Sequence, residues 1–170
     1  RGILEIQPAI VGQIMGGKSY DLAIVTAAAG LGSLLASGWI GLGKLEQSHI
    51  QKYLWPMLVT GIVASALLYL VVDLTPVSLI FIVTGFTATI VGIGAQTLIQ
   101  LEVQESYRAR VMTWWSTISF GSLFLGGTMA GFLGDIVGMN HAILYMMLAA
   151  GILAFSVLPR IKALTGSNPV

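Results

Sequence analysis

The sequence predicts an all-α fold, a polytopic bundle of transmembrane helices, and three observations support this prediction. First, 56% of the 170 residues are hydrophobic and only 9% are charged, whereas a soluble domain carries about 25% charged residues. Second, five stretches of 20 or more residues contain no charge at all, and about 20 apolar residues in a helix cross roughly 30 Å of hydrocarbon. Third, no segment alternates with period two, as a barrel strand would. In lipid, a single segment satisfies its own backbone hydrogen bonds only as a helix.

These charge-free stretches predict five complete spans and part of a sixth. The complete spans are expected at about residues 22–43, 54–72, 76–100, 111–134 and 139–159. Residues 1–17 begin inside an apolar stretch and are expected to form the end of a truncated span. The helical bundle is thus expected to cover residues 1–164, and residues 165–170 to form a disordered tail.

Prolines refine this expectation. Pro8 lies inside the first segment, where the missing backbone N–H predicts a kink. Pro56 and Pro76 are expected at helix starts, where a missing N–H does no harm.

Basic residues occupy alternate turns. One set of turns carries six of them: Lys44, Lys52, Arg108, Arg110, Arg160 and Lys162. The opposite set carries only Lys18, together with Asp21, Asp73 and Asp135. Because basic loops stay in the cytoplasm, the first set and the C-terminus are expected to be cytoplasmic.

Composition disfavours several other functions. A net charge of +1 gives no reason to expect a nucleic-acid partner. The chain has no cysteine, and its two histidines, His49 and His141, fall on opposite predicted sides of the membrane. They therefore cannot share a metal or a catalytic site. No Walker loop is present, so the sequence predicts neither an enzyme nor a metal or cofactor site.

The second and fifth predicted spans resemble each other. Residues 32–38 read Gly-Ser-Leu-Leu-Ala-Ser-Gly, and residues 121–127 read Gly-Ser-Leu-Phe-Leu-Gly-Gly. Three spans separate the two copies, so the copies cross the membrane in opposite directions, which indicates two inverted three-helix repeats. Small residues on these helices are candidates for close helix packing: Gly32, Gly38, Gly127 and Gly131. They favour either a tight static interface or a surface that moves during transport.

Residues 96–138 contain a familiar pattern. A glutamine-bearing helix end is followed by Arg108-Ala109-Arg110-Val111-Met112 and then by a glycine-rich helix that closes at Asp135 and Gly138. Together with Arg1-Gly2-Ile3-Leu4-Glu5 and residues 26–32, this pattern resembles the second half of major facilitator superfamily exporters. More narrowly, it is similar to the bacterial branch that contains the enterobactin exporter.

The resemblance implies the C-terminal six-helix half of a twelve-helix secondary transporter, with its first helix truncated. Its implied partners are a small-molecule substrate, the lipid bilayer and the missing N-terminal half of the same chain. The implied activity is proton-coupled efflux by alternating access in the bacterial plasma (inner) membrane. A non-transporting polytopic anchor or assembly subunit is the alternative. Two departures occur: Ala109 replaces the usual glycine, and the loop at residues 41–46 lacks the usual basic run, so no gating role is carried over to that loop.

Polar residues inside the spans are candidates for a substrate or proton pathway, because ionisable groups in a membrane are costly. Arg1 and Glu5 are four residues apart and so share a helix face. Glu5 is expected to couple protons or recognise a cation, or else to form a structural ion pair with Arg1. Neutral candidates lie on helices that line the cavity in the resembling family: Gln7, Gln13, Thr87 and Gln96. A threonine at such a position often bonds back to its own helix instead.

Two roles are possible for the charged residues at the span ends: gating between conformations, or formation of the turn between two helices. Arg108 and Arg110 are expected either to pair with Glu102 and Glu105 as a latch, or to act only in topology. Asp135 is expected to cap the turn into the last helix.

Overall fold

In the computed structural model, the described residues form helices joined by short turns, and none of them lies in a strand. The structure describes residues 2–42 and 50–165, with residues 50, 51 and 157–165 described by their backbone alone. Five long helices are present: α3 (Ser19–Gly41), α4 (Ile50–Ala66), α5 (Leu74–Glu102), α6 (Glu105–Val137) and α7 (Met139–Thr165). A 3-10 turn, η3 (Leu67–Leu70), extends α4. The chain begins with three short pieces: α1 (Gly2–Glu5), α2 (Gln7–Ala9) and a π-helix, η1 (Ile10–Ile14).

The five predicted spans are confirmed as helices that are long and apolar enough to cross a membrane. Each observed helix lies within a few residues of its expected bounds at most ends, and α6 and α7 extend further, to Glu105 and Thr165. A helix continues beyond the hydrocarbon until a turn residue ends it. The additional residues of α6 and α7 therefore include polar residues that were expected in the turns, such as Arg108 and Arg110. Gly138 is such a residue, since its φ of 84° lets the chain pass directly from α6 into α7. The expected disordered tail at 165–170 lies outside the described residues, apart from Thr165 at the end of α7.

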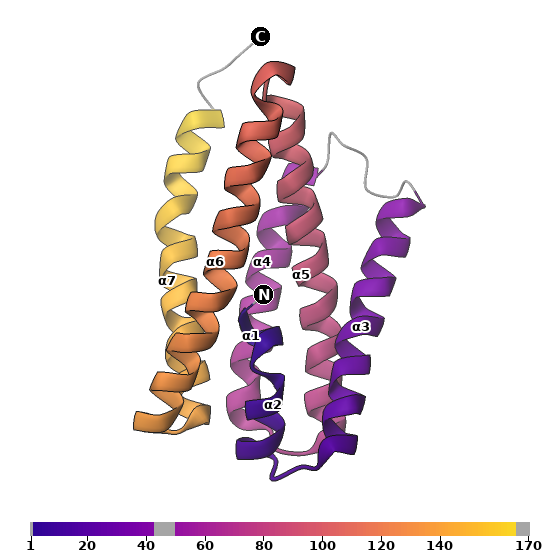
Figure 1. Cartoon of the computed structure of the whole chain (residues 1–170), viewed down its shortest axis with the longest axis vertical. Helices are drawn as coiled ribbons and strands as arrows, with labels where there is room; N and C mark the ends of the chain where they lie inside the picture. The colour runs from indigo at the N-terminus through magenta and orange to yellow at the C-terminus, as the bar shows by residue number, and fades with distance from the viewer. Residues whose placement is uncertain (1, 43–49, 166–170) are drawn as a thin grey trace.

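The long helices stand roughly side by side, with α3 at one edge, α7 at the other and α4 and α5 between them (Figure 1). α5 packs along both α3 and α4, and α7 packs on α4 and α6. The short N-terminal segment (residues 2–17) lies in front of α4, where α1 contacts α6 and α2 contacts α3. Successive helices run in opposite directions.

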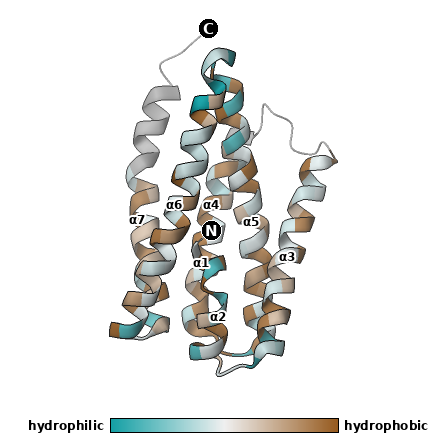
Figure 2. Ribbon diagram, viewed as in Figure 1, coloured by the Kyte–Doolittle hydropathy of each residue, from teal (hydrophilic) through white to brown (hydrophobic). Residues whose placement is uncertain are grey.

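Hydrophilic residues gather at the two ends of the bundle, and apolar residues cover its middle (Figure 2). Lys52, Arg108 and Arg110 begin helices at one end. The turns with Asp21, Asp73 and Asp135 meet at the opposite end. The alternation of charged turns predicted from the sequence therefore holds for the described residues.

The N-terminal segment is broken rather than continuous. Ile6 leaves helical geometry, with φ −97° and ψ 14°, two residues before Pro8, whose missing N–H and bulky ring disrupt the preceding turn. The widened π-turn that follows closes with a bond from the Met15 N–H to the Ile10 carbonyl, at 3.3 Å. The kink predicted at Pro8 is thus confirmed. The expectation for Pro56 is wrong, because α4 begins at Ile50 and Pro56 lies inside that helix.

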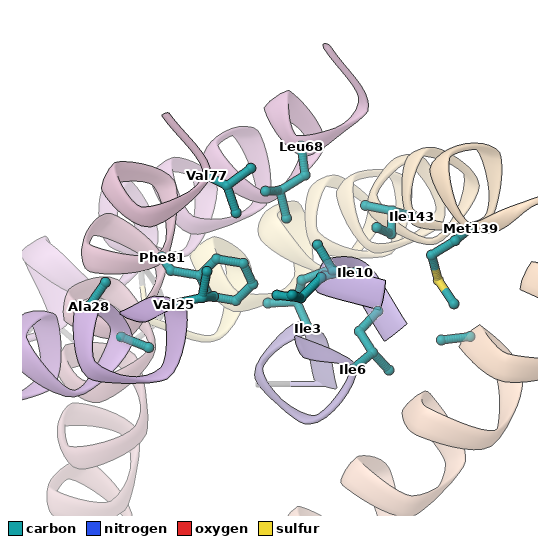
Figure 3. Packing of buried hydrophobic residues seen from close by; sticks show 13 residues of the cluster. Ile3, Ile6, Ile10, Val25, Ala28, Leu68, Val77, Phe81, Met139 and Ile143 are labelled. Atoms are coloured by element: carbon teal, nitrogen blue, oxygen red, sulfur yellow. The ribbon is translucent and has the colours of Figure 1, made fainter. Parts of the chain in front are cut away.

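The buried core is centred on this broken segment. Ile10 is fully buried, and its neighbours in the cluster include Val25, Leu68, Phe81 and Ile143, which come from α3, η3, α5 and α7 (Figure 3). These residues all lie toward the end of the bundle where the acidic turns meet. The short segment therefore lies where α3, η3, α5 and α7 meet, and it contacts residues of all four in one core.

A second packing feature is the crossing of α3 and α5 at two glycines. A Cβ atom on Gly32 would overlap the backbone carbonyl of Ile82, and one on Gly85 would overlap the carbonyl of Ala29. The Ser33 hydroxyl also donates to the Gly85 carbonyl, at 3.4 Å. The two backbones touch because neither glycine has a side chain.

Candidate functional site

A polar pair lies where the N-terminal segment meets α3. The Thr26 hydroxyl donates a hydrogen bond to the Gln7 side-chain oxygen, at 2.8 Å. Gln7 is only 6% exposed, beside the apolar core residues Ile3, Ile6 and Ile10. A buried amide retains a polar partner because leaving it without one costs free energy in an apolar setting.

This pair differs from the other hydroxyl contacts in the bundle. Nearly every other serine or threonine bond among the described residues runs to a carbonyl three or four positions earlier in the same helix, for example Thr97 to Ile93 and Thr128 to Phe124. Thr26 instead reaches another segment, and its bond is the one side-chain to side-chain hydrogen bond that the described residues make. The Gln7 amide N–H₂ group donates to no described residue, so it can donate a hydrogen bond to a ligand oxygen.

Two further polar groups of the same segment are exposed. Glu5 ends α1 and Gln13 lies in η1, and both side chains are on the surface of the bundle. Figure 2 shows the hydrophilic colour of α1 partway along the bundle, well away from both ends. Arg1, the expected partner of Glu5, lies outside the described residues.

The remaining pathway candidates lie apart from this group. Thr87 is 3% exposed and bonds back to the Val83 carbonyl of its own helix, at 2.9 Å. Its hydroxyl faces α4, since a Cβ on Gly61 would lie 2.8 Å from it. Of the two roles expected for Thr87, the bond back to its own helix is the one observed. Gln96 is exposed on α5, in the half of that helix that leads to the basic end of the bundle.

The expected contacts of the charged turn residues do not form. Among the described residues, no ion pair within 4.0 Å joins Arg108 or Arg110 to Glu102 or Glu105, and all four side chains are exposed. Exposed flexible pairs gain little from pairing in water. Asp135 is also exposed in the last turn of α6 and makes no capping bond, because Gly138 forms the turn instead.

The packing candidates divide into two groups. Gly32 is buried in the α3–α5 crossing. A Cβ added to Gly38, Gly127 or Gly131 would meet nothing within 4 Å. Of the four glycines predicted to pack closely, only Gly32 does so in the described residues, and the other three leave open surface on α3 and α6.

Removal of the hydrogen bond between Thr26 and Gln7 is expected to lower the free energy of unfolding only slightly. Thr26→Val and Gln7→Leu should each weaken the bundle, with a coupling energy of about 0.6 kcal/mol and at most about 1.7 kcal/mol, the range for hydrogen bonds between membrane helices. A double-mutant cycle on unfolding in detergent micelles measures this value. Thr97→Val, which removes only a bond within α5, is the control.

Sequence reasoning missed Thr26 and Gly85. Thr26 falls in a run of small residues, Thr-Ala-Ala-Ala-Gly, and Gly85 precedes Phe86 in a stretch with no repeat. Only the approach of a second helix distinguishes them. The structure brings together the buried Gln7 amide and the hydroxyl of the exposed Thr26, with an exposed carboxylate and an exposed amide on the same short N-terminal segment. Comparisons of this chain with protein-family models, with curated proteins and with solved structures found no match.

Proposed function

We propose that this chain forms half of a secondary transporter of the major facilitator type, in which two helical bundles rock about a central pathway. The pathway is lined on this side by the N-terminal segment, and Glu5 carries the coupled proton. The proposal extends to a bacterial inner membrane, with the basic turns on the cytoplasmic side. Five apolar helices of spanning length are the setting that it requires.

The observation that carries the proposal is a pair of close glycine crossings. Gly32 of α3 meets α5 near Gly85. Gly2 of α1 meets Gly126 of α6, where an added Cβ on either residue would lie 3.7–3.8 Å from the other's Cα. We count the N-terminal segment as the first helix and α3, α4, α5, α6 and α7 as the second to the sixth. The first crossing then joins the second and fourth helices, and the other joins the fifth and first.

The two crossings are equivalent under an exchange of halves. The exchange replaces the N-terminal segment by α5, α3 by α6 and α4 by α7. In each of these pairs the members run in opposite directions (Figure 1). The contact of α4 with α5 then corresponds to that of α7 with η1, and the contact of α2 with α3 to that of α5 with α6. One contact breaks the equivalence. α6 packs on α7, and the exchange would require α3 to pack equally on α4, but the described residues of α3 and α4 make no contact of that extent.

Such an exchange supports inverted repeats, the arrangement from which many transporters build alternating access. Its register differs from that of the sequence alignment. A Cβ added to Gly121, the residue aligned with Gly32, would meet nothing within 4 Å, and Gly126 makes the corresponding contact.

Exposure of polar groups supports a pathway on this face. A carboxylate in contact with hydrocarbon costs about 2.5–3.5 kcal/mol or more. Glu5 and Gln13 are exposed at the surface of a segment that buries Ile3, Ile6 and Ile10 in the core. That face is therefore better suited to water, substrate or a second bundle than to lipid.

The test is proton movement driven by substrate. In inside-out vesicles that contain the natural full-length protein, adding a substrate drawn from a panel of small amphipathic cations and neutral molecules should discharge an imposed pH gradient. Glu5→Gln should abolish the discharge, because glutamine cannot exchange a proton, and Glu5→Asp should retain part of it. A fluorescent amine that reports the gradient gives the readout.

Ser156→Ala serves as the control, since it removes a hydroxyl that bonds only within α7 and leaves the N-terminal segment unaltered. Discharge by Glu5→Gln that equals the parent's would refute the proton role. If no compound in the panel discharges the gradient, the non-transporting anchor becomes the better account.

A further inference from the structure

A groove on the outer surface runs between α4 and α7, on helices that contribute nothing to the polar group of the N-terminal segment. Its volume is about 750 Å³. Residues that line it include Leu67 and Tyr69 from the α4 side, and Leu148, Gly151 and Ile152 from α7. Apart from the Tyr69 hydroxyl, its lining side chains are all apolar. Lining residues from one end of the groove to the other are more than half exposed, namely Leu70, Leu148, Ile152 and Phe155, so the groove is open to its surroundings.

Small residues and the end of α4 shape this groove. Gly151 and Ala66 face it from opposite walls, and a Cβ on Gly151 would meet nothing within 4 Å. α4 tightens into the 3-10 turn η3 at Leu67. The narrower turn and the missing side chains leave a channel where two helices would otherwise close together.

The dimensions of the groove suit one leaflet of a bilayer. Its lining on α7 extends from Leu144 to Phe155, which at 1.5 Å per residue is about 16 Å. Half of a 30 Å hydrocarbon core is about 15 Å. The groove is also continuous with the apolar surface of the spanning helices, so its natural neighbour is hydrocarbon and not water.

A polar aromatic cluster stands at one end of the groove. The ring centroids of Tyr69 and His141 are 5.5 Å apart, and those of His141 and Tyr145 are 6.4 Å apart. All three side chains are exposed, and His141 lies in the first turn of α7, at the acidic end of the bundle. Rings with a polar atom favour the level of lipid headgroups, where Tyr69 and His141 offer hydrogen-bond donors.

We propose that the α4–α7 groove binds one glycerophospholipid of the leaflet at the acidic end of the bundle. One acyl chain lies along Leu148, Gly151 and Ile152. The phosphate accepts hydrogen bonds from the Tyr69 hydroxyl and the His141 imidazole. This lipid site is independent of the transport proposal, because it is formed by α4, η3 and α7 and not by the N-terminal segment that carries Glu5.

The test uses the intact protein in nanodiscs with a phosphatidylethanolamine that carries a diazirine in one acyl chain. Photolysis should place most of the label on the groove residues of α4 and α7. Gly151→Phe fills the groove and should lower this labelling about tenfold, the ratio that corresponds to about 1.4 kcal/mol of lost binding. Gly121→Phe, at another glycine with open space around it, should leave the labelling unchanged.

A second probe separates the headgroup from the chain. The double variant Tyr69→Phe, His141→Phe removes both hydrogen-bond donors, so it should reduce labelling by the phospholipid and leave labelling by a diacylglycerol with the same diazirine chain unaltered. Equal losses for both probes would refute the phosphate contact. Labelling spread evenly over exposed residues such as Phe120 and Phe124 would refute the site itself. So would disulfide-linked dimers of an Ile152→Cys variant, because a second copy of the chain would then occupy the groove.

Discussion

Gly85→Ala and Gly32→Ala are expected to destabilise the bundle, although alanine is the better helix former by about 1 kcal/mol. Each new Cβ would overlap a backbone carbonyl of the facing helix, that of Ala29 or of Ile82. A carbonyl cannot rotate away as a side chain can, so α3 and α5 must separate. Overpacking of this kind costs about 1–3 kcal/mol, and in lipid the lost packing is not offset by a hydrophobic effect between helices.

Gly38→Ala is the matched control for this prediction, because Gly38 lies on α3 as Gly32 does. Its added methyl group meets open space, so the variant should be as stable as the parent or more stable. Thermal unfolding in one detergent, followed by circular dichroism, compares the three variants. An equal or higher midpoint for Gly85→Ala than for Gly38→Ala would show that the two backbones do not touch.

Ile10→Asp is expected to have the largest effect of any single change in the N-terminal segment. Ile10 is fully buried and packs in a cluster with Phe81 and Ile143. Among the described residues the buried polar or charged side chains include no basic one, so the carboxylate would be buried without a described partner. Burial of an unpaired charge is among the few changes that cost more than about 4 kcal/mol, and the segment should leave the bundle.

Size-exclusion chromatography after detergent extraction, combined with limited proteolysis at the N-terminal segment, measures the outcome. Ile10→Val should cost only about 0.5–1.5 kcal/mol, since it removes one methyl group. Gln13→Asp places the same carboxylate on an exposed position of the segment and should remain folded. An Ile10→Asp protein that resists protease as the parent does would mean that the segment is not central to the core.

The spans were predictable because one physical requirement determines them. A stretch of 20 or more residues without a charge has few stable alternatives to a helix in lipid, so charges alone located α3 to α7. The same logic located the kink, because Pro8 removes a specific hydrogen bond. Pro56 was misplaced since charge spacing marks where hydrocarbon begins and not where a helix starts.

The site was less predictable because both faces of a membrane helix are apolar. In a soluble helix, polar residues mark the face that points outward. Here Leu34 is 71% exposed and Phe81 is buried, yet nothing in their chemistry distinguishes them. The sequence therefore did not reveal that Thr87 faces α4, that Gly85 meets Ala29, or that Thr26 bonds to Gln7.

The central claim is that these helices span a bilayer with their charged turns on alternating sides, and single cysteines test it most directly. The chain has no cysteine of its own, so Asp73→Cys and Ser106→Cys each give one labelling site, at opposite ends of the bundle. With a membrane-impermeant maleimide in intact cells, Asp73→Cys should react at once, and Ser106→Cys only after the membrane is permeabilised. Equal reaction of both cysteines in intact cells would contradict the account.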